Sequence, residues 1–219
     1  MRFRTSDELI PSLVAELRPV RPLAGPTHRA LRWAAGGAVF VFAGAAALGL
    51  RGDLASQLRN PHYLRESAAL ALTIALSARS AFELGIPNLA RDVRWPLAAI
   101  AVLLTWCVQV ALAVAPLPEL PLVLARFWRS GLACVHRTTW LALAPALGIS
   151  WMLRRGAPLE RSAAGLFAAL AAAALATLGT QFICVNDEPW HALVWHVAPV
   201  ILAGLAGSAL GTRLARRTS

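Results

Sequence analysis

Long uncharged runs alternate with short arginine-rich segments along the whole chain. Four of the runs, at 33–50, 95–115, 162–185 and 192–212, contain no aspartate, glutamate or arginine. A helix rises about 1.5 Å per residue, so about 20 apolar residues cross a bilayer core of ~30 Å. Each of the four runs therefore predicts a transmembrane helix.

Two further runs predict transmembrane helices although each contains charged residues. The run at 132–153 carries Arg137 in its first turns, from where a long side chain can reach the membrane surface. The run at 64–84 is interrupted by Arg79 and Glu83, which lie one helical turn apart and can therefore pair. The whole pattern predicts an all-α, polytopic membrane protein. We expect a short cytoplasmic N-terminal tail (1–32), a six-transmembrane-helix bundle (33–212) and a cytoplasmic C-terminal tail (213–219).

The composition agrees with a membrane protein and excludes a soluble one. Hydrophobic residues make up 58% of the 219 residues and charged residues only 15%, whereas soluble domains average about 25% charged residues. The net charge of +10 comes from 21 basic residues, all arginine, against 11 acidic residues. Because the arginines flank the apolar runs, we assign them to contact with membrane lipid and expect no direct nucleic-acid binding.

The arginines also predict which side of the membrane faces the cytoplasm. Six spans place both termini on one side, where fourteen arginines fall, against five on the other side. By the positive-inside rule the richer side is cytoplasmic. We therefore expect a multi-pass protein of the bacterial inner (plasma) membrane with both termini in the cytoplasm. The loops are too short to hold a catalytic domain, so we expect no enzyme activity.

The cytoplasmic tail contains an apolar stripe at helical spacing. Ser6, Asp7 and Glu8 are typical of a helix start, and Pro11 restricts the regular helix to about 11–18. The stripe consists of Leu9, Ile10, Leu13, Val14 and Leu17. A membrane-surface helix and a docking peptide for a cytosolic partner both fit such a stripe.

Two of the three cysteines fall at one boundary of the predicted membrane. Cys134 begins the fourth span and Cys184 ends the fifth, so both are expected on the periplasmic side and close in space. Polar neighbours follow them along the chain, namely His136, Asn186, Asp187, Glu188 and His191. Thiolate sulfur with imidazole favours a soft metal ion such as Cu(I), Zn or Cd. The alternative is that the cysteines are buried as small hydrophobic residues, as we expect for Cys107 in the third span.

Among the histidines we favour His191 as a metal ligand. His191 and His196 lie five residues apart, which is about 140° around an α-helix, so they are poorly placed to bind one metal together. The candidate metal ligands are therefore Cys134, Cys184 and His191.

Other features of the spans indicate packing and anchoring. Gly207 and Gly211 form a GxxxG spacing in the last span, which favours close helix packing, with a homodimer interface as the alternative. Four tryptophans fall at the predicted membrane interfaces, where an aromatic belt is expected. These are Trp33, Trp95, Trp151 and Trp190.

The chain resembles the NrsF-type transmembrane anti-sigma factors, which are negative regulators of extracytoplasmic-function sigma factors. The resemblance rests on the tail, on Cys134 at the start of span four, and on the sequence CVNDEPWHALVWH from Cys184 to His196. It implies that the protein holds a sigma factor at the inner membrane. It also implies that two periplasm-side cysteines, here Cys134 and Cys184, sense heavy-metal stress, with copper as the first candidate. The apolar stripe of the tail would then dock the sigma factor.

Two other classes of function fit the sequence less well. A small-molecule or ion transporter needs polar groups at mid-membrane depth, and the spans offer few, chiefly Thr73, Gln109, Thr177 and Gln181. A redox or haem membrane protein would call for a Cys-x-x-Cys pair or for histidines that share a helix face at mid-depth, and neither pattern is present. We therefore favour a regulator without an organic cofactor.

Overall fold

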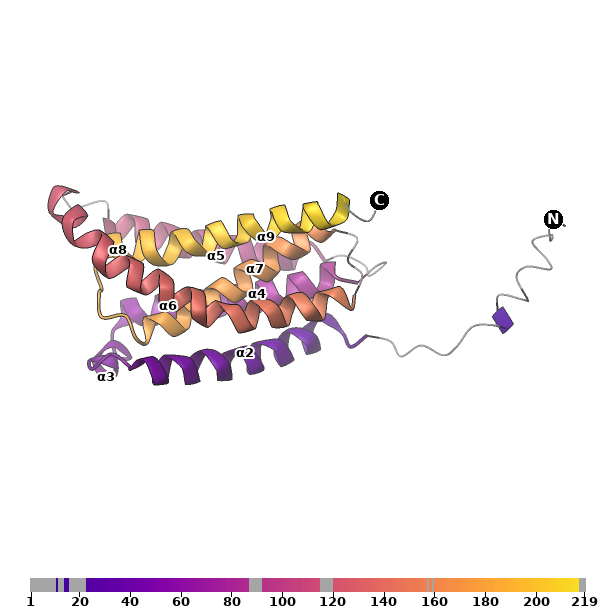
Figure 1. Cartoon of the computed structure of the whole chain (residues 1–219), viewed down its shortest axis with the longest axis horizontal. Helices are drawn as coiled ribbons and strands as arrows, with labels where there is room; N and C mark the ends of the chain where they lie inside the picture. The colour runs from indigo at the N-terminus through magenta and orange to yellow at the C-terminus, as the bar shows by residue number, and fades with distance from the viewer. Residues whose placement is uncertain are drawn as a thin grey trace.

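The long helices of the molecule lie side by side along its long axis (Figure 1). The computed structural model describes residues 11, 14–15, 23–86, 92–114, 120–156, 158 and 160–216. Its elements are α2 (Pro26–Leu48), α3 (Leu54–Gln57), α4 (Pro61–Leu84), α5 (Arg94–Val114), α6 (Leu120–Arg154), α7 (Arg161–Gln181), α8 (Pro189–Ala192), the π-helix η1 (Leu193–Val197) and α9 (Ala198–Arg216). These described ranges contain no strand.

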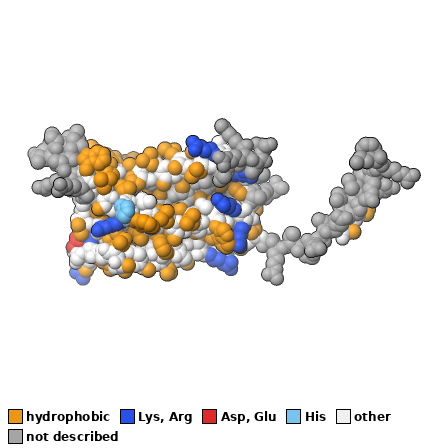
Figure 2. Space-filling model, viewed as in Figure 1, with side chains coloured by type: hydrophobic (Ala, Val, Ile, Leu, Met, Phe, Trp, Pro, Cys, Tyr) orange, Lys and Arg blue, Asp and Glu red, His pale blue; other side chains and the backbone are white. Residues whose placement is uncertain are grey.

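Within the described residues, six helices are long and apolar enough to cross a membrane. They are α2, α4, α5, the Gly131–Arg154 part of α6, α7, and the continuous segment Pro189–Arg213. Helix α2 begins and α9 ends at the same end of the bundle, as an even number of crossings requires (Figure 1). The flank of the bundle is mainly hydrophobic and its arginines lie toward the ends (Figure 2). The prediction of an all-α bundle with six spans is confirmed.

Helix α7 forms the centre of the bundle. It packs against α9, α4 and α6, and most of its residues are buried. Its four consecutive alanines at 171–174 are all buried, and such small side chains let neighbouring backbones approach closely.

The glycines of the GxxxG spacing are used for this packing. A Cβ atom on Gly207 would lie 2.4 Å from the carbonyl oxygen of Gly165, and one on Gly211 would lie 2.1 Å from that of Arg161. No side chain fits at such distances, so α7 already occupies the glycine face of α9. The structure thus agrees with the packing interpretation and leaves this face unavailable to a second copy of the chain.

Arg79 and Glu83 of α4 pair with each other, as predicted from their spacing. Arg79 donates to the Glu83 carboxylate, which also accepts the backbone N–H of Asp92 at 2.8 Å. The Arg79 guanidinium lies 4.0 Å from the centre of the Trp95 ring. Helix α4 therefore accommodates this charged pair in a membrane span by placing it near one end, while Arg65 and Glu66 lie near the other end.

Helix α2 begins at Pro26, seven residues before the predicted start at Trp33. One face of the additional turns packs against the bundle, where Arg29 and Ala30 are buried. The Trp33 indole N–H donates to the carbonyl oxygen of Pro145 at 2.8 Å, and Arg29 donates to that of Met152. The prediction that Trp33 lies in an interfacial belt is wrong, because this hydrogen bond holds the ring inside the bundle.

Helix α6 is longer than its predicted span. The sequence predicts a span at 132–153, but the helix begins at Leu120 and continues to Arg154. Charged residues mark the end of a membrane span but do not end a helix. Pro121 is accommodated because proline is tolerated in a first helical turn.

Most of the predicted sigma-docking stripe lies outside the described residues, namely Leu9, Ile10, Leu13 and Leu17. Val14 is described: its backbone is helical, and the residue is 59% exposed. The role of the stripe stays a prediction.

Candidate metal centre

Two cysteines that lie far apart in the sequence meet at the end of the bundle opposite the termini. Cys134 lies on α6, Cys184 follows α7, and their Sγ atoms are 3.2 Å apart. Thr138 and Thr180 link the two helices directly beneath the thiols, with 2.8 Å between their hydroxyl oxygens. The backbone N–H of Cys184 donates to the Thr180 carbonyl at 2.8 Å, which sets the direction of the chain after α7. The expected proximity of the cysteines is therefore observed.

The imidazole of His191 completes a three-residue contact. Its Nε2 atom lies 3.4 Å from the Sγ of Cys184, and the ring is buried. His191 belongs to the short helix α8, which starts at Pro189 after the loop that carries Cys184. The three predicted metal ligands thus lie together, although their binding of a metal stays a prediction.

A second histidine joins this group, contrary to the sequence argument. The rings of His191 and His196 lie 5.3 Å apart, centre to centre. The argument assumed an ideal α-helix, whereas residues Leu193–Val197 form a π-helical turn. In a π-helix the hydrogen bonds run from residue i to i+5, so two residues five apart lie about one turn apart on one face. The expectation that the two histidines are poorly placed to bind one metal together is wrong for this reason.

The π-helical turn is held in place by a close approach of two elements. Trp195, in the turn, packs where Gly131 of α6 has no side chain, since a Cβ on Gly131 would lie 1.9 Å from the indole Cε2 atom. Trp128 of α6 packs edge-on against the same indole, with ring centres 5.8 Å apart. The turn that carries His196 is therefore fixed on the helix that carries Cys134.

The four side chains together offer a compact set of metal-binding atoms. One donor atom from each of Cys134, Cys184, His191 and His196 lies within 4.8 Å of the others, and all four residues are buried. The Nδ1 atom of His196 is buried with no hydrogen-bond partner among the described residues. Two sulfurs and two imidazole nitrogens are the donor set of many four-coordinate zinc sites, and sulfur also suits Cu(I) and Cd. The residues present therefore fit a soft or borderline metal ion.

The thiol of Cys184 lies in an environment that favours the thiolate. Hydrogen bonding from the Cys134 thiol, and then from His191 and His196, lowers the pKa of Cys184. The thiolate is the form that binds metals, so the neighbours prepare this sulfur for coordination.

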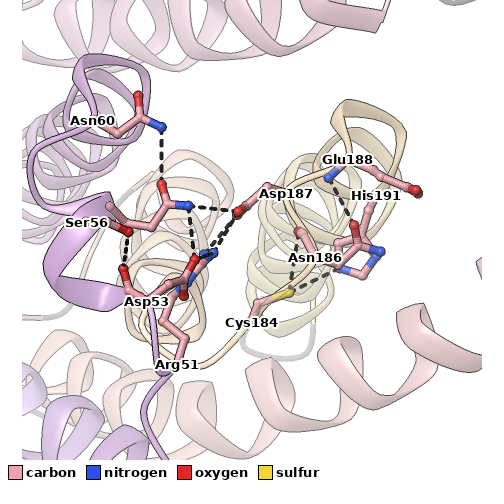
Figure 3. A network of polar contacts seen from close by, with 10 residues as sticks. Arg51, Asp53, Ser56, Asn60, Cys184, Asn186, Asp187, Glu188 and His191 are labelled. Carbon is pink, nitrogen blue, oxygen red and sulfur yellow. Dashed lines mark hydrogen bonds and ion pairs between the residues drawn. The ribbon is translucent and has the colours of Figure 1, made fainter.

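The side chains of the other polar neighbours that the sequence suggested do not join the cluster, although the backbone carbonyl of Asn186 accepts a hydrogen bond from the Cys184 thiol at 3.8 Å (Figure 3). His136 faces outward on α6 and accepts a hydrogen bond from the Trp140 indole at 2.9 Å. The side chain of Asn186 accepts the backbone N–H of Glu188 at 2.9 Å. Cys107 is partly buried against the hydrophobic core, in agreement with its expected role as a small hydrophobic residue.

Asp187 instead takes part in an ion-pair network that sequence reasoning missed (Figure 3). The Arg51 guanidinium binds the carboxylates of both Asp53 and Asp187, at shortest distances of 2.7 Å. Hydrogen bonds to these carboxylates raise the pKa of Arg51, and Arg51 lowers the pKa of Asp53 to about 2. The backbone N–H of Arg51 also donates to the Phe182 carbonyl at 2.9 Å. The network holds the loop that carries Cys184 against the segment after α2.

A cavity of about 180 Å³ opens beside the cluster. Cys184 and His196 contribute to its wall, as do Glu66 and His62 of α4. Neither Glu66 nor His62 was singled out from the sequence, because an isolated carboxylate or histidine near the end of a span carries no recognisable pattern.

Comparison with known proteins assigns the family. The family model described as "Negative regulator of sigma F", NrsF, matches residues 13–216, nearly the whole chain. No curated protein and no solved structure matches the chain. A match of this extent covers all six spans and all four residues of the Cys/His cluster, and so the chain belongs to the NrsF family of negative regulators of a sigma factor.

Proposed function

We propose that the chain is a membrane-bound anti-sigma factor that releases its sigma factor when a soft metal ion occupies the cluster of Cys134, Cys184, His191 and His196. The bound partner is an extracytoplasmic-function sigma factor, held at the bacterial inner membrane by the cytoplasmic tail. The family assignment supports a negative regulator of a sigma factor, and the remaining detail is our proposal.

The observation that carries the proposal is the buried four-donor set. Four metal-binding atoms from three separate segments lie within 4.8 Å of one another. Burial of four polar side chains in one place costs free energy unless their hydrogen bonds or a ligand satisfy them. An ion held there would join α6 to the segment that runs from Cys184 to His196. Copper is the first candidate for the signal, and zinc and cadmium share the same ligand preferences.

Energetics allow such an ion to switch the protein. Moving a two-state equilibrium from 1:99 to 99:1 takes about 5.5 kcal/mol of differential binding. Complete structural zinc sites supply apparent binding free energies of about 10 kcal/mol or more. A site that is intact in one state and distorted in the other therefore has enough binding energy to shift the population.

The metal centre is tested by titration of the purified full-length protein in detergent under reducing conditions. We expect Cd²⁺ to produce a thiolate charge-transfer absorbance that is lost in Cys134→Ser and in Cys184→Ser, and weakened in His191→Ala and His196→Ala. Cys107→Ser is the matched control and should bind as the wild type does. In cells, both serine variants of the pair should lose the sigma-dependent response to copper or cadmium. A normal response in either of them contradicts the proposed sensor.

The docking of the sigma factor is tested in the tail. Replacing Leu13 and Leu17 with aspartate places charge on the apolar stripe, and each buried leucine contributes about 1.5–3 kcal/mol to an interface. We expect the double variant to lose copurification of the sigma factor and to express its target genes without a metal. Retention of the sigma factor by this variant would show that the docking site lies elsewhere, with the cytoplasmic loops next to be tested.

A further inference from the structure

The cavity beside the metal centre joins exposed polar groups to two of the buried donors. Its wall includes His62 and Asp187, whose side chains are 51% and 55% exposed, and also Cys184 and His196, which are buried. Cys134 and His191 do not line it. A solute that enters the cavity from outside therefore meets Cys184 and His196 before it can meet the other two donors.

Most of the charge around the cavity is already compensated within the protein. Arg51 and Asp187 both line the wall and bind each other, and Asp53 binds Arg51 from the other side. Two carboxylates on one guanidinium leave this network with a net negative charge. This net negative charge at the cavity attracts an arriving cation, because a charged cleft raises the local concentration of ions of the opposite sign.

Glu66 is the carboxylate of the wall that lacks an arginine partner among the described residues. Its Oε1 atom lies 3.6 Å from Nδ1 of His62, and its Oε2 atom accepts a long hydrogen bond of 3.4 Å from Gln181. The side chain is only 15% exposed. A largely buried carboxylate with such weak partners is costly to keep charged, which points to a ligand that it serves.

We propose that the cavity is the entrance of the metal centre and that Glu66 and His62 form a transient site there for a divalent cation. This inference rests on the proposed function of the Cys/His cluster. A carboxylate oxygen and an imidazole nitrogen suit Zn²⁺ or Cd²⁺, whereas Cu(I) prefers sulfur. The ion binds first to Glu66 and His62, and then passes to His196 and Cys184 at the base of the cavity.

The test measures the rate of metal binding separately from its extent. Wild-type protein in detergent is mixed with CdCl₂ in a stopped-flow instrument, and the growth of the cadmium–thiolate absorbance gives the association rate constant. In Glu66→Gln we expect that rate constant to fall about tenfold, within the range of electrostatic steering, and to become less sensitive to salt. The final absorbance should equal that of the wild type, because all four donors remain. Glu188→Gln removes an exposed carboxylate outside the cavity and should change neither quantity.

A second variant tests the route without changing any charge. Ala113 of α5 lines the cavity, and Ala113→Leu should narrow it and slow Cd²⁺ binding while the final absorbance is preserved. The inference is overturned if Glu66→Gln and Ala113→Leu both bind Cd²⁺ at the wild-type rate, or if Glu66→Gln loses the final absorbance, which would make Glu66 a ligand of the centre itself. Absence of any cadmium–thiolate absorbance in the wild type would instead refute the metal centre, and the entrance with it.

Discussion

The contact between Gly131 and Trp195 allows a test of how the Cys/His cluster is held together. Gly131→Ala adds one methyl group at a point where its carbon would lie 1.9, 2.2 and 2.3 Å from three indole atoms of Trp195. Carbon atoms in contact normally stay about 3.5–4.0 Å apart, so the ring or the helix must move by roughly 1.5 Å. Such a movement shifts the π-helical turn that carries His196.

Two opposing effects decide the outcome for stability. Alanine favours a helix over glycine by about 1 kcal/mol, whereas overpacking in a well-packed interior costs about 1–3 kcal/mol. We therefore expect Gly131→Ala to fold, with stability lowered by about 2 kcal/mol at most. Metal geometry is less tolerant, because ligand distances must hold to about 0.2 Å and disturbed supporting residues weaken metal binding about 10–100-fold.

The assay is a Cd²⁺ titration of the purified protein, with thermal unfolding by circular dichroism on the same samples. Gly148→Ala is the matched control, since it lies on the same helix and its Cβ would meet Trp33 at an ordinary 3.7 Å. We expect Gly131→Ala to bind Cd²⁺ about 10–100-fold more weakly than Gly148→Ala. Equal affinities in the two variants would refute the argument that this contact positions the turn.

Three further outcomes follow from the structure. Val185 is 72% exposed at one end of the bundle and Val93 is 64% exposed at the opposite end. Val185→Cys should react with a membrane-impermeant maleimide in intact spheroplasts, whereas Val93→Cys should react only after lysis. The reverse pattern would invert the proposed orientation. Arg51 lowers the pKa of Asp53 to about 2, so this ion pair should stabilise the protein fully above the ordinary carboxyl pKa, near pH 4, and lose its effect as the pH falls toward 2. The stability of Asp53→Asn should therefore depend less on pH between about 4 and 2 than that of the wild type. Gly207→Leu cannot be placed against α7 and should lower the thermal midpoint markedly, and an unchanged midpoint would mean that this crossing contributes little.

The spans could be predicted because the bilayer imposes a simple requirement of length and charge. Helix α5 and the segment Pro189–Arg213 contain uncharged runs of the required length, and even α4 fits once Arg79 and Glu83 are placed near its end and paired. The first turns of α6 could not be predicted in the same way. They lie outside the run at 132–153 and are separated from it by Arg126 and Arg129, so the charge pattern that marks the spans gives no sign of a helix there.

The candidate site was predictable only in part, for geometric reasons. Counting crossings was sufficient to bring Cys134 and Cys184 to one end of the bundle. The position of His196 depends on a π-helical turn, which in turn depends on the fit of Trp195 against Gly131. That fit is a tertiary contact between elements more than sixty residues apart, so the regular helical periodicity of the sequence gives no sign of it.

Helix α6 connects the Cys/His cluster with the start of α2, the helix that follows the N-terminal tail in the sequence. Cys134 lies near one end of its membrane span, while Trp33 and Arg29 of α2 donate to the backbone oxygens of Pro145 and Met152 near the other end. A tilt of α6 therefore displaces the anchor points of α2, from which the tail extends. Because the acceptors are backbone oxygens, no side-chain substitution in α6 removes them. A genetic screen for variants that bind metal but keep their sigma factor should therefore find its mutations in α2, which supplies the two donors.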